Sequence, residues 1–253
     1  MTERWTSTGY GNWVSTKLIY GPALLAVAFL GLSFLHVAFL VGAVPFLGAL
    51  VYFAYARHAF SPRGGGIQAK VWELLLSRLE WSGTGQVLDI GCGNGPLTIE
   101  LALRHPDARV TGIDYWGKAW DYSKEVCERN AEAAGVAGRT NFQRASASDL
   151  PFGEETFDAV VSNFVFHEVS DTPDKRALVR EALRVLKKGG SFAFQDLFGV
   201  RAFYGEPDDL LETIRDWGIA EVSFVDTSTS DFIPRALRLP FMLGRISVIH
   251  GTK

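Results

Sequence analysis

The nine residues from Val87 to Gly95 read Val-Leu-Asp-Ile-Gly-Cys-Gly-Asn-Gly. A short apolar run of this kind is typical of a buried strand, and here it leads into three glycines at alternate positions. Glycine lets the backbone turn sharply and approach a ligand closely, which a Cβ would prevent. The spacing differs from the G-x-G-x-x-G that seats a pyrophosphate at the start of a helix. The stretch therefore predicts a strand followed by a ligand-binding turn of another kind.

Strand and helix patterns alternate on both sides of this stretch. Apolar residues at helical spacing predict a helix over residues 67–79, and 86–90 is the first strand. The elements expected next are a helix at 97–105, a strand at 108–113, a helix at about 118–134, strands at 140–145 and 157–163, a helix at 174–186, a strand at 191–195, a helix at about 207–217, and strands at 220–225 and 245–249. This alternation predicts an α/β fold, with a parallel sheet covered by helices on both faces and a ligand crevice at the carboxyl ends of its strands.

Three acidic side chains are expected near that edge of the sheet. Asp89 lies inside the first strand, Asp114 ends the second, and Asp149 follows the third. A carboxylate at the end of the second strand can accept hydrogen bonds from both hydroxyls of a ribose. Asp149 is placed to receive an adenine amino group.

With these pieces in order, the sequence resembles the class I S-adenosylmethionine-dependent methyltransferases. The matching segments are residues 87–95, 111–114, 147–152, 157–162 and 183–190. The resemblance implies a Rossmann-like seven-stranded methyltransferase sheet over residues 67–253, with helices on both faces and S-adenosylmethionine as the cofactor. Lys188 stands where the family often has proline. A nucleotide-binding α/β domain with a different cofactor is the alternative.

The resemblance also assigns roles in the cofactor site. Gly91, Gly93 and the neighbouring backbone would pass under the methionine portion, and Asp89 would orient its amino group. Asp114 would hold the ribose. The other residues expected to bind the cofactor are Cys92 and Asn94 in the glycine turn, Tyr115 or Trp116 against the adenine ring, Ser148, Asp149 and Leu150 at the adenine edge, and Asn163 and Phe164 beside the reacting methyl group.

Methyl transfer from a sulfonium needs mainly alignment of the two reactants and exclusion of water. A general base matters only if the acceptor carries a proton. His167 and Glu168, just beyond the fourth strand, are the candidates for that base and its orienting carboxylate. The alternative is that His167 begins a helix and packs while Glu168 is solvated. Asp196, at the end of the fifth strand, borders the same crevice, and no metal site is expected.

The first 60 residues differ from the rest in composition. From Leu18 to Ala56 there are 39 consecutive residues without Asp, Glu, Lys or Arg. One helix of that length would span about twice the ~30 Å of a bilayer's hydrocarbon core. We therefore expect a transmembrane hairpin of two helices within residues 18–60, each about 19 residues long, with the break near 42–45, where Gly42 and Pro45 weaken a helix. A buried hairpin in a soluble protein and a signal peptide are the alternatives.

Charge is distributed unevenly along the chain. Residues 1–70 carry +4, and because the whole chain carries −3, the remainder carries −7. Basic residues flank the apolar run on both sides, which predicts that both ends of the hairpin and the catalytic domain are cytoplasmic. The acidic remainder argues against nucleic acid as a partner and favours a lipid bilayer as the partner of the hairpin. Residues 61–66, with one proline and three glycines, are the expected linker.

These features lead to one interpretation and two rivals. We expect a membrane-anchored methyltransferase that acts on a lipid-soluble or membrane-proximal small molecule, such as a quinone-like ring or a phospholipid amine. Methylation of a soluble metabolite is the first rival. A catalytically inactive membrane interaction protein that keeps the cofactor fold is the second. Residues 235–241, rich in Arg and bulky apolar side chains, are expected either to dip into lipid or to line the acceptor pocket.

Overall fold

The computed structural model describes residues 9–117 and 122–253, which form two units. Residues 12–70 make up a helical unit, and residues 9–11 together with 71–253 make up an α/β unit. Each unit has its own ordered structure.

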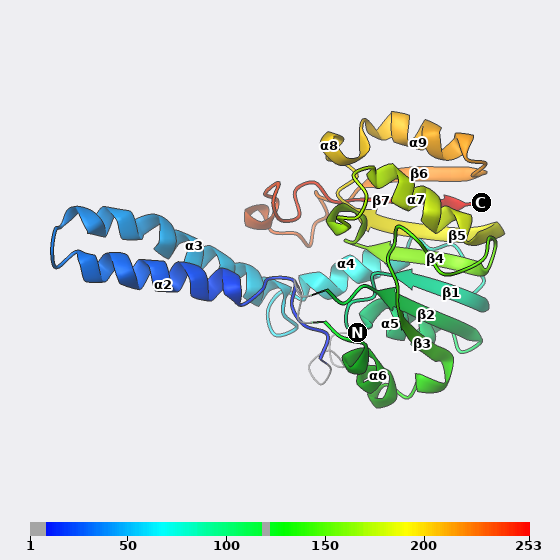
Figure 1. Ribbon diagram of the computed structural model, residues 1–253, viewed down its shortest axis with the longest axis horizontal. Helices are drawn as coiled ribbons and strands as arrows, with labels where there is room; N and C mark the ends of the chain where they lie inside the picture. The colour runs from blue at the N-terminus through cyan, green and yellow to red at the C-terminus, as the bar shows by residue number, and fades with distance from the viewer. Residues whose placement is uncertain (1–8, 118–121) are drawn as a thin grey trace. The chain divides into compact units, whose positions relative to one another are not determined.

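A seven-stranded sheet forms the centre of the α/β unit (Figure 1), with the strand order β3-β2-β1-β4-β5-β7-β6. The strands are β1 (Gly85–Ile90), β2 (Ala108–Asp114), β3 (Thr140–Arg144), β4 (Phe157–Asn163), β5 (Leu186–Asp196), β6 (Glu221–Asp226) and β7 (Ser247–Thr252). The first four match the predicted strands to within one residue at each end. β1 to β5 pair in parallel, whereas β7 lies antiparallel between β5 and β6. The expectation of a wholly parallel sheet is therefore wrong at β7, which returns from β6 without a crossover helix.

Helices flank this sheet. They are α4 (Ile67–Leu76), α5 (Pro96–Arg104), α6 (Lys124–Ala133), α7 (Lys175–Arg184), α8 (Arg201–Tyr204) and α9 (Pro207–Asp216), with short 3₁₀ turns η1 (Ala137–Arg139), η2 (Phe166–Glu168) and η3 (Arg235–Leu237). The central strands are apolar without alternation because both of their faces are covered. Ala159, Val160 and Val161 in β4 are all fully buried. The helix predicted at 118–134 begins at α6, after an N-cap in which the Ser123 hydroxyl accepts the Val126 N–H. Residues 118–121 lie outside the described residues.

The junction between α7 and β5 differs from the prediction. The helix ends at Arg184, and β5 begins five residues earlier than expected, with Leu186 paired to Phe157. The register shifts between Phe157 and Ala159, so the glycine turn that precedes residue 191 is an irregularity inside one long strand. A strand that contains glycines and lysines at a bulge lacks the apolar run that marks a strand in sequence.

Two antiparallel helices, α2 (Lys17–Leu32) and α3 (Ala38–Phe60), make up most of the helical unit. The turn between them lies at residues 33–37, so the break predicted at 42–45 is wrong, and Pro45 lies inside α3. Polar side chains stabilise the observed turn. The Ser33 hydroxyl donates to the Leu30 carbonyl at 2.6 Å, and His36 Nδ1 accepts the Ala38 N–H at 3.1 Å.

Gly42 is where the two helices pack most closely. A Cβ at this position would lie 2.5 Å from the ring of Phe29 on α2. The same ring packs against Phe39 and Phe46, which lie one turn to either side of Gly42 on α3. Because Gly42 has no side chain, it leaves space on the surface of α3 for the ring of Phe29, and the helix continues through this position without a break.

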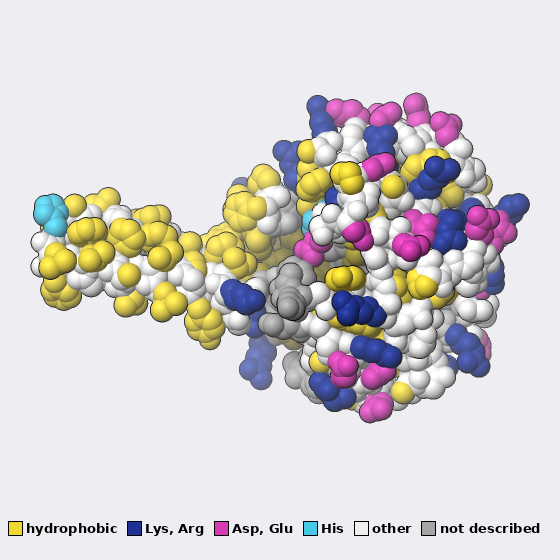
Figure 2. All heavy atoms as spheres, in the orientation of Figure 1, with side chains coloured by type: hydrophobic (Ala, Val, Ile, Leu, Met, Phe, Trp, Pro, Cys, Tyr) yellow, Lys and Arg dark blue, Asp and Glu magenta, His cyan; other side chains and the backbone are white. Residues whose placement is uncertain are grey.

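The outer surface of this helical pair is apolar (Figure 2). Of the twenty large hydrophobic side chains that are exposed among the described residues, sixteen lie between Leu18 and Tyr55. α3 has 23 residues and a mean hydropathy of 1.9, and it is long and apolar enough to cross a membrane. α2 is apolar too, but its 16 residues rise only about 24 Å, which is short of a ~30 Å hydrocarbon core.

Candidate active site

The carboxyl ends of four strands meet at one edge of the sheet. In the register, Ile90 of β1 lies beside Ile113 of β2 and Ser162 of β4, and Asn163 lies beside Gln195 of β5. The residues that follow these positions are therefore neighbours. They are the glycine turn 91–95, Asp114, Asn163 with Phe164, and Asp196.

The glycine turn requires glycine at its first position. Gly91 has φ of +73°, and a Cβ there would lie 2.0 Å from Val165 Cγ2. The N–H groups of Gly91 and Cys92 both donate to the Ile113 carbonyl, at 2.8 and 2.9 Å. Gly95 then adopts the left-handed conformation that precedes Pro96 at the start of α5. The turn is held against β2 and the β4 end, and its backbone faces the edge where the strands finish.

Asp89 is a buried carboxylate with one oxygen in use. Its Oδ2 accepts the Thr98 hydroxyl at 2.7 Å, whereas Oδ1 has no hydrogen-bond partner among the described residues. Burial raises the pKa of Asp89 to about 7, because the hydrogen bonds from Thr98 offset only part of the cost of burying the charge. Asn163 Oδ1 is likewise buried and without a partner among those residues. A buried acceptor is costly to leave unpaired, so these two oxygens mark a place for a donor-rich ligand group.

Asp114 is held by the backbone of the glycine turn. Its Oδ2 accepts the Gly93 N–H at 2.9 Å, and its Oδ1 accepts the Trp116 N–H at 2.7 Å. Burial raises the pKa of Asp114, and these backbone hydrogen bonds oppose the shift. Each carboxylate oxygen can accept more than one hydrogen bond, so the ability to bind a pair of hydroxyls remains.

The two aromatic residues after Asp114 point to different partners. Trp116 Nε1 donates to the Gly93 carbonyl at 2.9 Å, which ties the indole to the glycine turn. Tyr115 is exposed, and the guanidinium of Arg144 lies 4.7 Å from its ring centre. Whether either ring packs on adenine stays a prediction.

Asn94 uses its side chain to hold the turn together. Its Nδ2 donates to the Gly9 carbonyl at 2.8 Å, its Oδ1 accepts the Ser123 N–H at 3.1 Å, and its backbone carbonyl accepts Asn130 Nδ2 at 3.0 Å. Asn130 Oδ1 in turn accepts the Gly9 N–H at 3.2 Å. Asn94 is therefore a positioning residue for the turn. Sequence reasoning missed Gly9, Ser123 and Asn130, because no local pattern links residues up to 85 positions apart.

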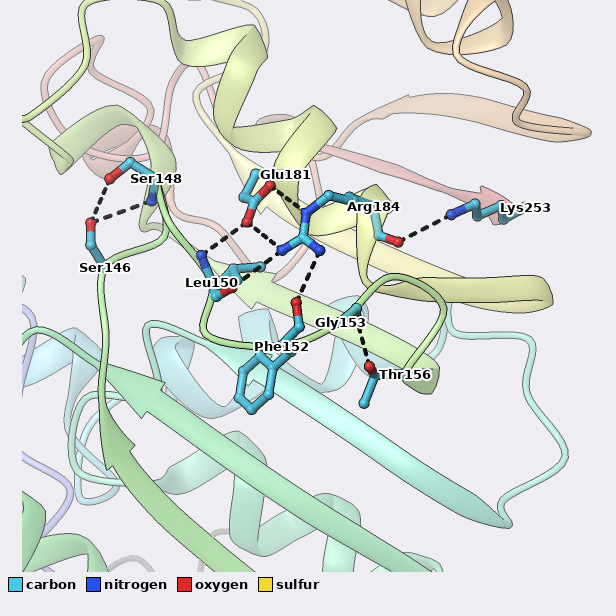
Figure 3. A network of polar contacts seen from close by, with 9 residues as sticks. All are labelled: Ser146, Ser148, Leu150, Phe152, Gly153, Thr156, Glu181, Arg184 and Lys253. Carbon is cyan, nitrogen blue, oxygen red and sulfur yellow. Dashed lines mark hydrogen bonds and ion pairs between the residues drawn. The ribbon is translucent and has the colours of Figure 1, made fainter.

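The loop after β3 is clamped to α7 (Figure 3). The Leu150 N–H donates to Glu181 Oε1 at 2.9 Å, and Arg184 bridges Glu181 to the carbonyls of Leu150 and Phe152. Lys253 Nζ donates to the Leu183 and Arg184 carbonyls, at 2.8 and 3.3 Å, and so caps the end of α7. The Leu150 N–H donates to Glu181 and is therefore already engaged, whereas a backbone N–H at the adenine edge would have to donate to a ring nitrogen. The predicted role of Asp149 as acceptor of the adenine amino group stays a prediction.

Ser148 belongs to a small polar cluster beside Asp149. The hydroxyls of Ser146 and Ser148 lie 2.8 Å apart, and both donate to Asp171 Oδ2, at 2.7 and 2.6 Å. These hydrogen bonds lower the pKa of Asp171. The Ser148 hydroxyl thus ties the loop to Asp171.

A buried His–Asp pair occupies the edge between β4 and β5. His167 Nδ1 and Asp196 Oδ1 are 2.7 Å apart, and Asp196 is fully buried. Asp196 also accepts the N–H groups of Val165 and Leu197, at 3.1 and 2.6 Å. The carboxylate that hydrogen-bonds the His167 ring is thus Asp196, whereas the sequence predicts the orienting role for Glu168, whose Oε1 is 3.9 Å from His167 Nε2. Which carboxylate orients the ring during catalysis stays a prediction.

The environment of His167 sets its protonation. Burial lowers the pKa of the ring, but the hydrogen bond and charge of Asp196 outweigh it, so the pKa of His167 is raised above its usual range. The ring of Phe203 lies 6.4 Å from the imidazole, and Phe164 meets the imidazole edge-on at 6.2 Å. With Nδ1 held by Asp196, the imidazole nitrogen left for a reacting group is Nε2.

Residues 88–194 match the sequence model of a family described as a methyltransferase domain. This part of the α/β unit is therefore similar to a methyltransferase domain. The chain is 31% identical over 126 residues to the ubiquinone/menaquinone biosynthesis C-methyltransferase UbiE of Geotalea daltonii, an alignment that covers 49% of this chain and 51% of that protein. It is 34% identical over 140 residues to the 27-O-demethylrifamycin SV methyltransferase of Amycolatopsis mediterranei, with 55% and 48% covered. The chain thus spans about half the length of the curated relatives it matches.

Solved structures share the fold of the α/β unit at low identity. The geranyl diphosphate C-methyltransferase of Streptomyces coelicolor A3(2), solved with Mg²⁺, geranyl diphosphate and S-adenosylhomocysteine, gives a TM-score of 0.55 at 17% identity, with 73% of this chain and 79% of that chain covered. The [4+2]-cyclase SpnF gives 0.54 at 20% identity, with 72% and 79% covered. Because one of these folds serves a cyclase, the fold alone does not decide the chemistry.

The residues at the sheet edge fit S-adenosylmethionine, the cofactor of this class of methyltransferase. The side-chain oxygens of Asp89 and Asn163, which have no partner among the described residues, would be acceptors for the N–H groups of its ammonium. Asp114 is positioned to accept ribose hydroxyls.

Proposed function

We propose that this chain is a membrane-anchored methyltransferase that transfers a methyl group from S-adenosylmethionine to a membrane-proximal small molecule, such as a quinone-like ring or a phospholipid amine. The cofactor supplies an activated methyl group on a sulfonium. The chain supplies the residues that bind the cofactor at the carboxyl ends of the strands, and His167 as the base. The observation that carries the proposal is the pairing of His167 with buried Asp196 at the edge that also holds the cofactor residues.

The His–Asp pair supports an acceptor that loses a proton. A thioether or tertiary amine acceptor would need no base, whereas an ammonium, a phenol or an acidic ring carbon does. His167 Nε2 would take that proton, and Asp196 would hold the imidazole in the correct tautomer and stabilise the imidazolium that forms. The raised pKa of His167 makes it a stronger base than an unpaired histidine.

The helical pair supports an acceptor that resides in a membrane. Its outer surface is apolar, α3 is long enough to span a bilayer, and basic residues stand at both ends of the apolar stretch. Anchoring confines the enzyme to the surface where a lipid-soluble acceptor is concentrated, so capture becomes effectively intramolecular. The name of the Geotalea daltonii relative, a quinone-biosynthesis C-methyltransferase, supports the quinone-like class.

The test uses the full chain in detergent micelles, methyl-labelled S-adenosylmethionine and a total lipid extract from the source organism. We expect label in one lipid band. The variant His167→Gln should lower its rate of appearance by about 10²–10⁴-fold, the usual contribution of a general base, while cofactor affinity changes less than twofold. Arg215→Gln, at an exposed position on α9, is the matched control.

Three outcomes separate the proposal from its rivals. Label that appears only in water-soluble metabolites would assign a soluble acceptor. Tight cofactor binding without product from any extract would assign an inactive protein that keeps the fold. Full activity of His167→Gln on a lipid band would remove the base from the proposal and leave the membrane acceptor.

A further inference from the structure

The segment between β6 and β7, residues Thr227–Ile246, begins and ends at the reaction edge. In the register of the last three strands, Ser247 pairs with both Asp226 of β6 and Asp196 of β5. The base of the segment is closed by a hydrogen bond from the Thr227 N–H to the Ile246 carbonyl at 3.2 Å. The segment therefore projects from the level of Asp196, the carboxylate that holds His167.

This β6–β7 segment has a fixed internal structure despite its lack of long helices or strands. Ile233, Leu237 and Leu243 are buried. Arg238 donates to the Ile233 carbonyl at 3.0 Å and to the Ser230 carbonyl at 3.2 Å, which satisfies backbone acceptors inside the segment. Its exposed side chains are thus presented by an ordered scaffold.

The tip of the segment exposes apolar side chains. Leu239 is 36% exposed, Phe241 is 67% exposed, and Pro240 between them is also exposed. Among the described residues of the α/β unit, only four large hydrophobic side chains are exposed, and the other two, Tyr115 and Phe203, border the site. Exposed apolar side chains that gather on one part of a surface usually mark an interaction site.

The charged side chains from residue 232 to residue 246 are all basic, and Arg235 and Arg245 among them are exposed. The one acid of the segment, Asp231, is exposed near its start. Neither of these arginines forms an ion pair with any residue the structure describes. Apolar side chains flanked by cationic groups match the boundary between lipid chains and anionic headgroups, whereas two or three apolar side chains are too small an area for a stable protein interface.

We propose that the β6–β7 segment is a membrane-contact loop, in which Leu239 and Phe241 enter the interfacial layer of the bilayer while Arg235 and Arg245 bind anionic lipid headgroups. The proposal rests on the membrane-associated function proposed above, because it needs a bilayer beside the domain. The loop would hold the edge of the sheet that carries His167 and Asp196 at the lipid surface. A lipid-soluble acceptor could then enter the site without passing through water.

The test places an environment-sensitive fluorophore on the tip. Phe241→Cys is labelled in the full chain, since the native thiols of Cys92 and Cys127 are buried, and the protein is placed in nanodiscs of phosphatidylcholine and phosphatidylglycerol that carry nitroxide-labelled lipids. Lys188→Cys is the matched control, because this side chain is 84% exposed and lies in the irregular part of β5 near Phe157, at the opposite end of the sheet. Leu24→Cys on the exposed surface of α2 reports on the hairpin.

We expect nitroxide quenching at position 241 to exceed that at position 188 by at least threefold. Quenching at position 24 but not at 241 would overturn the membrane-contact loop and leave the anchor in place. Quenching at none of the three positions would overturn both proposals. Unchanged cofactor affinity of each labelled variant shows that the fold is intact.

The contact of Arg235 and Arg245 with anionic headgroups is tested by changing either the lipid or the two arginines. Replacing phosphatidylglycerol by phosphatidylcholine, or making the double variant Arg235→Gln/Arg245→Gln, should lower the quenching at position 241 by at least twofold. Arg215→Gln should leave it unchanged. Equal quenching with and without anionic lipid would overturn the headgroup contact.

Discussion

Asp89 carries an ionisable group at a position that water does not reach, and its pKa of about 7 follows from that burial. A carboxylate there would pair with the ammonium of S-adenosylmethionine, whereas the protonated acid would not. Binding of the cofactor should therefore require Asp89 to ionise.

The affinity of the protein for S-adenosylmethionine should rise with pH as Asp89 loses its proton. A group with a pKa of about 7 is mostly protonated at pH 6 and mostly ionised at pH 7.5, so we expect a gain of roughly fivefold to tenfold across that interval. Asp89→Asn should bind more weakly and flatten the dependence. Isothermal titration calorimetry at both pH values measures the effect, and Asp216→Asn, an exposed acid on α9, is the control. Parallel pH curves for the parent protein and Asp89→Asn would contradict the assignment.

His167 should control a separate limb of the pH profile, that of turnover. A base acts in its neutral form, so the rate should rise as pH increases through the pKa of His167, which Asp196 holds above the usual 6.5. Replacing Asp196 by Asn removes the charge that outweighs burial. The midpoint of the rising limb should then move to lower pH while the maximal rate falls. Turnover measured from pH 5.5 to 9 tests this, and a midpoint that does not move would separate the two residues functionally.

The positions of the site residues could be predicted from the sequence more readily than their partners. The sequence predicts Asp114 and Asp196 at strand ends, and Asp89 inside its strand, and parallel strands place their carboxyl ends together. It pairs His167 with Glu168, its neighbour in sequence, whereas in the structure the ring is hydrogen-bonded to Asp196. Asp196 is 29 residues away and becomes the partner only because β4 and β5 are adjacent. Such pairings depend on strand order, which local patterns do not encode.

At the scale of elements, α2 and α3 show how one glycine can serve packing within a helix. Gly42 was expected to break the helix together with Pro45, because both residues have low helix propensity. In the structure the turn lies at residues 33–37, and Gly42 accommodates the ring of Phe29. The apolar run could be divided into two helices by length alone, but its turn could not be located from propensity.

Gly42 and Gly48 form a matched pair for testing this packing. Both lie in α3, but a Cβ at Gly42 would lie 2.5 Å from the Phe29 ring, whereas one at Gly48 would meet nothing within 4 Å. Gly42→Ala should destabilise the helical pair by about 1–3 kcal/mol through overpacking. Gly48→Ala should be neutral or stabilise it by about 0.4–1 kcal/mol through the unfolded chain. Hydrogen exchange of α2 and α3 amides in micelles measures both, and equal effects would show that the space left by Gly42 has no role in packing.

At the scale of the whole molecule, most of the exposed apolar side chains belong to the helical unit, whereas the candidate active site belongs to the α/β unit. The helical unit holds sixteen of the twenty exposed large hydrophobic side chains, while the α/β unit buries most of its own. Insertion of the helical unit into a membrane would therefore leave the core of the α/β unit unchanged.

Charges placed on the hairpin surface should weaken its association with membranes and leave the cofactor site intact. Leu24 and Val51 are exposed on α2 and α3, and each Glu introduced there would cost about 2–3 kcal/mol if it were buried in hydrocarbon. We expect Leu24→Glu/Val51→Glu to shift a large part of the protein from the detergent-extracted to the soluble fraction. Leu24→Ala/Val51→Ala should remain with the membrane. Sedimentation of vesicles decides the matter, and unchanged sedimentation of the Glu variant would argue against insertion.

The bond between Gly9 and Asn94 has a consequence for how the chain can meet a bilayer. Gly9 precedes the two helices and Asn94 follows them, so this contact closes a ring of chain that contains both. Because the two ends of this stretch of chain are held together, both lie on the same side of the bilayer. The chain between them therefore crosses the bilayer an even number of times. If α3 alone crossed the bilayer, the hydrogen bond between Gly9 and Asn94 would be broken and the glycine turn would lose this support. Zero or two membrane crossings are therefore the arrangements that keep the hydrogen bond.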